Sequence, residues 1–147
     1  MNAKEYLSQA IWLDRVITNK LEQKEELEAL AKRVTVDFTQ EKVSGGKATR
    51  SPMEDATVKL IDLSNEINDD IDEYVDLKKE IMGTIKQVDD IRYRLILKMR
   101  YISAKDWDDI VIAMGYDRST VFRNHKKALK EVDEILKMRP NATRHRV

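Results

Sequence analysis

The chain has 147 residues, of which 37% are charged and 6% aromatic, with four glycines, two prolines and a formal net charge of zero. This length suits one ordinary domain or a small domain with an elongated appendage, and the composition favours an all-α fold with long exposed helices. The chain has no cysteine, which excludes disulfides and thiolate metal sites.

A long helix is predicted over residues 3–42. Apolar residues recur there near heptad spacing, with charged residues between them and Lys24 as an interruption. The stripe consists of Leu7, Ala10, Leu13, Ile17, Leu21, Leu27, Leu30, Val34 and Phe38. Two glycines and a proline in residues 43–52 then predict an exposed turn.

A second helix is predicted to begin at Pro52, because Ser51 can cap it and Glu54 completes a capping box. Its apolar positions step regularly by four and three residues, with polar side chains at two of them. The stripe consists of Leu60, Ser64, Ile67, Ile71, Tyr74, Lys78, Ile81, Ile85 and Val88.

Two helices of similar length joined by a short turn should pack antiparallel. Residues 1–88 are therefore predicted to form a helical hairpin of the coiled-coil type. Neither stripe is wide enough for a globular core, so we expect the hairpin to associate with further copies, with a homodimer favoured.

A compact domain is predicted over residues 89–138, followed by a basic flexible tail at 139–147. The first helix of this domain is expected to carry apolar residues on one face, at Ile91, Leu95, Met99 and Ile102. A short helix should run from Ala104 to Met114, with Ser103 and Asp106 as its capping signal and Gly115 as its left-handed stop.

The last helix is predicted from Arg118 to about Met138, with Asp117 as its cap and Pro140 beyond its end. Its inward residues are predicted to be Val121, Ala128, Leu129, Val132 and Leu136. The charge pattern singles out this part of the chain: residues 91–147 carry 14 basic and 7 acidic side chains, whereas residues 53–90 carry 4 basic and 12 acidic ones. A basic segment of this kind favours a polyanionic partner.

The spacing of Ile110, Gly115 and Val121 is typical of a helix-turn-helix, which places its second helix in the major groove of DNA. Arginine pairs with guanine through two parallel donors, and hydroxyls can bond base edges or phosphates. The candidate base-reading residues are therefore Arg118, Ser119, Thr120 and Arg123. Residues further along the helix are better placed for phosphates, and these are Lys126, Lys127 and Lys130.

The run LKMRYISAKDWDDIVIAMGYDRSTVFRNHKKALKEV resembles region 4 of sigma factors. Together with KEYLSQAIWLDRVITNKLEQ and LIDLSNEINDDIDEYVDLKKEIM, it makes residues 4–136 similar to the sigma-region-4-like late transcription regulators of phages and prophages of Gram-positive bacteria, the RinA-like and ArpU-like group. The resemblance implies control of phage late genes through double-stranded DNA, with RNA polymerase as a candidate second partner. It maps the reading helix onto Arg118, Ser119, Thr120 and Arg123.

Two positions depart from the family pattern. Val111 stands where the helix crossing usually has alanine or glycine, and Asn124 stands where an apolar residue usually packs. Asn124 is therefore also a candidate adenine reader, turned outward with His125 and Ala128 taking over the packing.

Two other functions fit the same features. A phage small terminase subunit also joins a DNA-binding helix-turn-helix to an oligomerising hairpin, and a protein-interaction module could dock the basic helix on an acidic partner. The two histidines, His125 and His145, have no cysteine nearby, and no nucleophile stands beside a base. We therefore expect no metal site, no cofactor and no catalysis.

The expected location is the cytoplasm of a bacterial host cell. No apolar run reaches the roughly 18 residues that cross a bilayer, and the N-terminus lacks the plan of a signal peptide. No membrane partner is expected.

Overall fold

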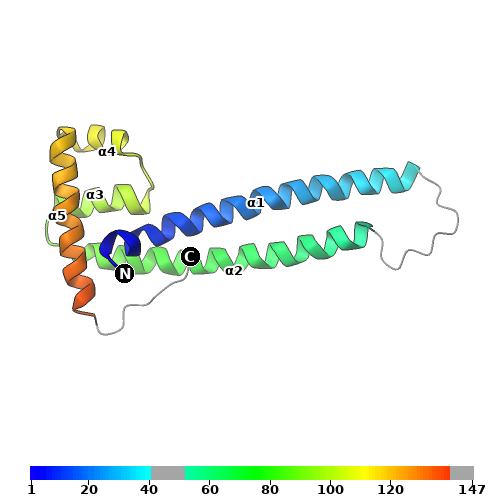
Figure 1. The fold of residues 1–147 in the computed structure, drawn as a ribbon, viewed down its shortest axis with the longest axis horizontal. Coiled ribbons are helices and arrows are strands. Elements are labelled where there is room, and N and C mark those ends of the chain that lie inside the picture. Colours follow the sequence, from blue (N-terminus) through cyan, green and yellow to red (C-terminus); the bar gives the residue numbers. More distant parts are fainter. Residues whose placement is uncertain (41–51, 140–147) are drawn as a thin grey trace. The chain divides into compact units, whose positions relative to one another are not determined.

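The computed structural model describes residues 1–40 and 52–139, and its elements are helical (Figure 1). They are α1 (Ala3–Gln40), α2 (Pro52–Lys86), α3 (Ile91–Leu97), the π-helical turn η1 (Lys98–Ile102), α4 (Trp107–Met114) and α5 (Arg118–Lys137). Within these ranges the predicted all-α fold is confirmed. The predicted turn with its Ser51 cap, residues 140–147 of the predicted tail, and the side chains of Val34 and Phe38 lie outside the described residues.

The helices are distributed over two compact units, one of Met1–Asp14 with Glu73–Val147 and one of Arg15–Asp72. Helices α1 and α2 each contribute residues to both units. The predicted boundary at residue 88 falls in the break between α2 and α3. Whether residues 1–88 and 89–138 fold as separate domains stays a prediction.

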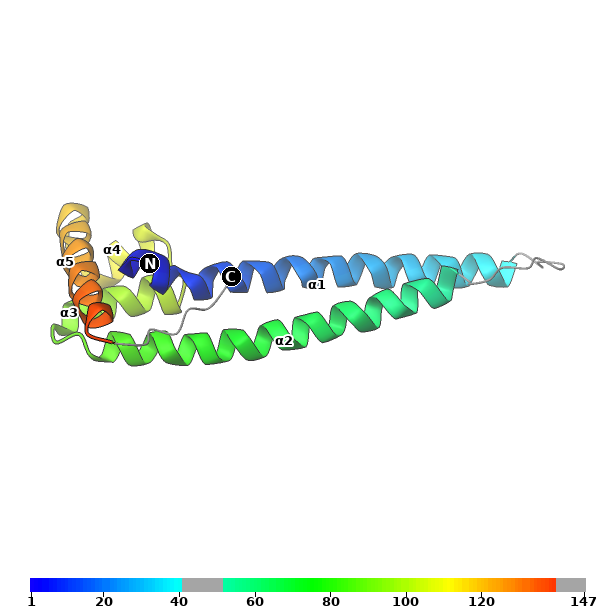
Figure 2. The same ribbon diagram turned by 60° about the horizontal axis from the view of Figure 1, so that its bottom comes forward.

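In the unit Arg15–Asp72, α1 and α2 run side by side (Figures 1 and 2). Lys20 Nζ lies 2.6 Å from Asp70 Oδ2 and 3.7 Å from Glu66 Oε2. The hydrogen bond to Asp70 raises the pKa of Lys20. Because Leu27, further along α1, lies beside Leu63, earlier in α2, the two segments are antiparallel.

The apolar stripes of this unit are only partly covered. Ile17 and Ile67 are buried, as predicted, but Leu21, Leu30 and Ile71 are 44%, 50% and 40% exposed. Two helices in contact shield a narrow seam, so the flanking positions of each heptad stay open to solvent.

In the other unit, the first turns of α1 pack against the last turns of α2. Leu7 is fully buried, as are Leu77, Ile81 and Ile85. The Tyr6 hydroxyl lies 2.9 Å from Thr84 Oγ1, a hydrogen bond that satisfies both buried hydroxyls.

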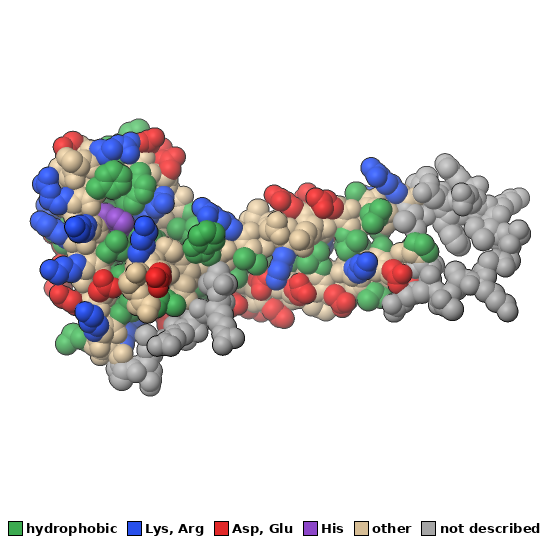
Figure 3. All heavy atoms as spheres, in the orientation of Figure 1, with side chains coloured by type: hydrophobic (Ala, Val, Ile, Leu, Met, Phe, Trp, Pro, Cys, Tyr) green, Lys and Arg blue, Asp and Glu red, His purple; other side chains and the backbone are tan. Residues whose placement is uncertain are grey.

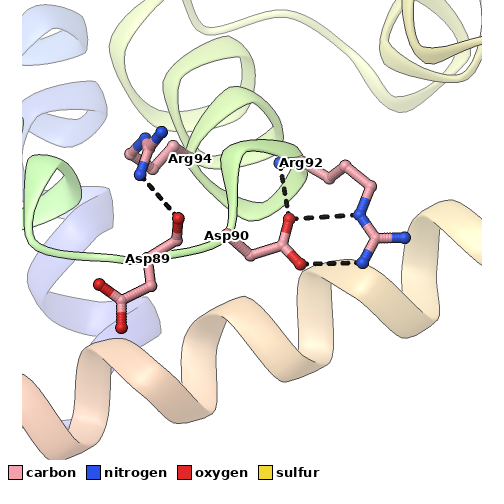
Figure 4. A network of polar contacts seen from close by, with 4 residues as sticks. All are labelled: Asp89, Asp90, Arg92 and Arg94. Atoms are coloured by element: carbon pink, nitrogen blue, oxygen red, sulfur yellow. Dashed lines mark hydrogen bonds and ion pairs between the residues drawn. The ribbon is translucent and has the colours of Figure 1, made fainter.

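A polar turn ends α2 and begins α3 (Figure 4). The Asp90 carboxylate caps α3 by accepting from the Arg92 backbone N–H at 2.8 Å, and the Arg92 guanidinium donates to both of its oxygens. These hydrogen bonds lower the pKa of Asp90 to about 2. Arg94 Nη1 donates to the carbonyls of Val88 and Asp89 at 2.7 and 2.9 Å.

The apolar face predicted for residues 91–102 is wrong at Ile91 and Leu95 and confirmed at Met99. Ile91 and Leu95 are 68% and 46% exposed, and Ile102 is half-buried. The buried residues are Ile96, Leu97, Met99 and Tyr101. Helix α3 buries the side that carries Ile96 and Leu97. From Lys98 onward η1 interrupts the α-helical period, because the Ser103 N–H donates to the Lys98 carbonyl five residues earlier.

The predicted start of the short helix is also wrong, by three residues. Ala104 has a φ of 53°, outside the right-handed helical region, and α4 begins at Trp107. Asp106 alone caps it, accepting from the Asp109 N–H at 2.8 Å. The predicted stop at Gly115 is confirmed, with a φ of 71°.

Helix α5 spans Arg118–Lys137, close to its predicted bounds, but two of its five predicted inward residues, Leu129 and Leu136, are only half-buried. Asp117 caps it by accepting from the Thr120 N–H at 3.3 Å, and Val121, Ala128 and Val132 are fully buried. Helices α3 and α4 both pack against α5. Val121 forms a core cluster with Met99 and Ile110, flanked by partly buried Trp107, Val111 and Met114. The packing fixes which face of α5 points to solvent.

Candidate functional site

The first two thirds of α5 form a basic exposed surface. Residues 118–130 contain five basic side chains and no acidic one. These residues, Arg118, Arg123, Lys126, Lys127 and Lys130, are all exposed. Figure 3 shows Lys and Arg side chains gathered over the part of the molecule that contains α5. We call these five residues the basic surface.

The centre of this surface can be located from helical spacing. Ser119, Arg123, Lys126 and Lys130 follow one another by four, three and four residues, so they lie in one row along the helix. This row lies opposite the buried residues Val121, Ala128 and Val132. Arg123 is therefore the arginine that projects most directly away from the core.

Arg118 lies at the edge of the basic surface, next to α4. Its guanidinium forms an ion pair with Asp108 and lies 5.8 Å from the centre of the Phe122 ring. The Arg118 and Asp108 side chains are 55% and 74% exposed. An exposed pair of this kind contributes at most about 1 kcal/mol, so Arg118 can exchange Asp108 for another acceptor at small cost.

Ser119 and Thr120 take part in the cap of α5. The Ser119 hydroxyl donates to Asp117 Oδ2 at 2.8 Å, and the Thr120 backbone N–H donates to Oδ1 of the same carboxylate. Ser119 is exposed and Thr120 is half-buried. The Thr120 and Ser119 side chains together hold the pKa of Asp117 below its ordinary value. Ser119 keeps its oxygen free to accept a further hydrogen bond, whereas Thr120 lies at the flank of the exposed face.

The prediction that Asn124 turns outward is wrong. Its side chain is only 7% exposed and lies among the buried residues of α5. The physical reason is the helical period: Asn124 stands three residues after Val121 and four before Ala128, on the packed face. Its position removes it from the residues that a ligand on the basic surface could touch.

The last third of α5 is acidic and bound to the rest of its unit. Asp133 Oδ1 accepts from the Ala3 backbone N–H at 2.6 Å, which ties α5 to the start of α1. Burial, followed by the charges of Asp89 and Asp90, raises the pKa of Glu131. The helix is thus divided into a basic exposed part and an acidic structural part.

Sequence reasoning missed a partly exposed aromatic cluster that includes Phe122 and His125 of α5. The Trp107 ring lies 4.9 Å from Phe122 and 4.6 Å from His125, centre to centre. His125 Nε2 lies 2.8 Å from the Tyr101 hydroxyl. Arg100 lies 5.0 Å from the centre of the Trp107 ring and donates to the Lys105 carbonyl. The sequence signal for this packing is that His125 stands four residues after Val121, which puts both side chains on the same side of the helix.

His125 is neutral at physiological pH. Burial, assisted by the positive charges of Lys4 and Arg100, lowers its pKa to about 4. Burial also raises the pKa of Tyr101 to about 12. The pair therefore joins two uncharged groups, and His125 adds no positive charge to the basic surface.

In residues 1–40 and 52–139, three or more His, Cys, Asp or Glu side chains nowhere gather as a metal ion would require. None of the described helices combines the length and apolarity of a membrane span.

Residues 34–133 match the family described as "Protein of unknown function (DUF1492)", a match that covers more than half of the chain. The chain belongs to this family. Comparison with curated proteins and with solved structures gave no match. The part of the chain that matches DUF1492 contains α4, the turn at Gly115 and the whole basic surface of α5.

Proposed function

We propose that this DUF1492 protein is a sequence-specific transcription regulator that binds double-stranded DNA through α5, without catalysis or a cofactor. The single observation that carries the proposal is the basic surface: five exposed cations and no acid on residues 118–130, over a face held rigid by buried Val121, Ala128 and Val132. DNA presents phosphates and base edges together, and such a surface can neutralise one while contacting the other.

In this proposal, α4 and α5 act as a helix-turn-helix. The stop at Gly115 and the Asp117 cap leave the first turns of α5 exposed, which suits insertion into a major groove about 12 Å wide. Arg123, at the centre of the exposed row, is the leading base reader, with Arg118 and Ser119 beside it. Lys126, Lys127 and Lys130 are the phosphate contacts.

The biological setting of the proposal rests on the resemblance to the sigma-region-4-like regulators. On that basis we propose control of phage late genes in a bacterial host, with RNA polymerase as a second partner. We also propose that the chain self-associates through the antiparallel helical hairpin of residues 1–88. A dimer would place two copies of α5 on two half-sites of the DNA.

The proposal is tested by comparing duplex DNA with another polyanion. The full chain should bind a random duplex with an affinity that falls steeply with salt, and should bind it more tightly than heparin of matched charge. Equal affinity for both, or no binding at low salt, would contradict DNA as the ligand of the basic surface.

A further inference from the structure

The unit Arg15–Asp72 contains an open groove between α1 and α2. Its volume is about 360 Å³, and it is lined by Gln23, Glu26, Leu27, Leu30, Lys59 and Leu63. All six side chains belong to this one unit. The groove lies away from the basic surface in sequence and takes no part in the proposed DNA contact.

Three of the residues that line the groove are leucines that remain incompletely covered. Leu30 is 50% exposed, and Leu27 and Leu63 are half-buried. Exposed leucines along a two-helix seam favour a further helical surface, because removing each of them from water is stabilising.

The walls of the groove carry opposite charges. Glu26 stands on the α1 wall and Lys59 on the α2 wall, and both are exposed. Among the described residues, neither side chain forms an ion pair. A groove with an acid on one wall and a base on the other is complementary to a copy of itself turned by 180°.

We propose that this groove is the contact between two copies of the chain, related by a two-fold axis parallel to α1 and α2. Such an axis places α1 of each copy over α2 of the other and brings each Glu26 to Lys59 of the other copy. An axis perpendicular to the helices would set α1 against α1 and bring the two Glu26 carboxylates together. The charges of Glu26 and Lys59 therefore favour a two-fold axis that runs parallel to the helices.

The proposed contact also fits the helical pattern of the unit. Four helices around one seam cover Leu27, Leu30 and Leu63 from both copies, which a pair of helices does not do. The contact deepens the self-association included in the proposed function by naming its surface and symmetry. Association is measured without DNA, so its failure and the failure of DNA binding are distinguishable.

The first test compares two leucines on opposite faces of α1. Leu21 and Leu30 are nine residues apart, which is about two and a half helical turns. Leu21 is 44% exposed and takes no part in the groove, so Leu21→Lys is a matched control for Leu30→Lys. Sedimentation of the full chain should show a dimer that Leu30→Lys weakens at least about thirtyfold and Leu21→Lys leaves within about threefold.

The second test uses charge reversal and mixing. Glu26→Lys gives both walls positive charges and Lys59→Glu gives both walls negative charges, so each variant alone should dimerise about tenfold more weakly. Mixing the two variants should restore a heterodimer, because each wall then faces its opposite. A contact within one chain could not produce this rescue.

Three results would overturn the proposal. One is a monomeric full chain at about 100 μM, well above the Kd expected for a specific dimer. Another is a dimer that Leu21→Lys weakens and Leu30→Lys does not. The third is a failure of the mixed charge variants to associate better than either variant alone, with circular dichroism confirming that both are helical.

Discussion

The two parts of α5 differ in what their charges do. Residues 118–130 carry cations on an exposed face, whereas Glu131 is half-buried and Asp133 accepts a hydrogen bond from the backbone N–H of Ala3 at the start of α1. The arginines of residues 91–147 also differ in whether their charge is used within the protein. Arg92 and Arg94 are bound to the turn before α3, while Arg123 faces solvent. Net charge alone therefore overstates the surface that is open to a ligand.

The largest effect on stability should come from a carboxylate placed on the buried face of α5, compared with one placed on its exposed face. Val132→Asp buries an unpaired carboxylate and should lower the free energy of unfolding by at least about 3 kcal/mol. Lys130→Asp, two residues away on the exposed face, should change stability by less than about 0.5 kcal/mol while weakening DNA binding. Thermal or denaturant unfolding measures both, and equal losses would mean that the assignment of faces is wrong.

The next effect separates the arginines from the lysines of the basic surface. Arg123→Ala or Arg118→Ala should cost about 1–3 kcal/mol at a specific site and relax the sequence preference there. Lys126→Ala or Lys127→Ala should weaken all duplexes alike and lower the salt slope by about 1. Titrations of specific and random duplexes at several salt concentrations distinguish the two roles, and identical losses for all four variants would contradict them.

A smaller effect concerns the aromatic cluster. The folded pKa of His125, about 4, lies below its unfolded value of about 6.5. The unfolded chain thus binds more protons between these values, and stability should fall by about 1–2 kcal/mol, after discounting for solvent screening, as the pH drops from 6.5 to 4.

His125→Gln provides the control for this prediction, because its side chain does not titrate. Its stability profile should lack the His125 contribution across the same pH window. Parallel profiles for the two proteins would show that His125 is not responsible.

The smallest effect concerns Asp108, which holds Arg118 in the unbound protein. Asp108→Asn frees the guanidinium and removes a negative charge beside the basic surface. DNA binding should therefore strengthen by up to about 1 kcal/mol, with Asp109→Asn as a nearby acid for comparison. Weaker binding in Asp108→Asn would indicate that the ion pair is needed to orient Arg118.

Local signals predicted α5 and its surroundings well. The stop at Gly115, the Asp117 cap and the inward row of Val121, Ala128 and Val132 all follow from short-range capping and helical periodicity. The five basic residues lie outside this inward row, so the same helical period predicts that they are exposed.

Features that depend on tertiary contacts were not predictable. Helix α3 buries Ile96 and Leu97 instead of Ile91 and Leu95, and a π-helical turn follows it, which no short motif predicts. Asn124 is a different case, because its position between Val121 and Ala128 could have predicted its inward orientation from the helical period alone. Position in the helix outweighed side-chain polarity there.

The most direct measurement is selection of bound duplexes from a random library by the full-length protein at physiological salt, in parallel with Arg123→Ala. We predict enrichment of one motif, present as two half-sites, with loss of preference at one position of each half-site in the variant. Salt-sensitive binding with no enriched motif, or a motif unchanged by Arg123→Ala, would contradict sequence reading by the exposed face of α5.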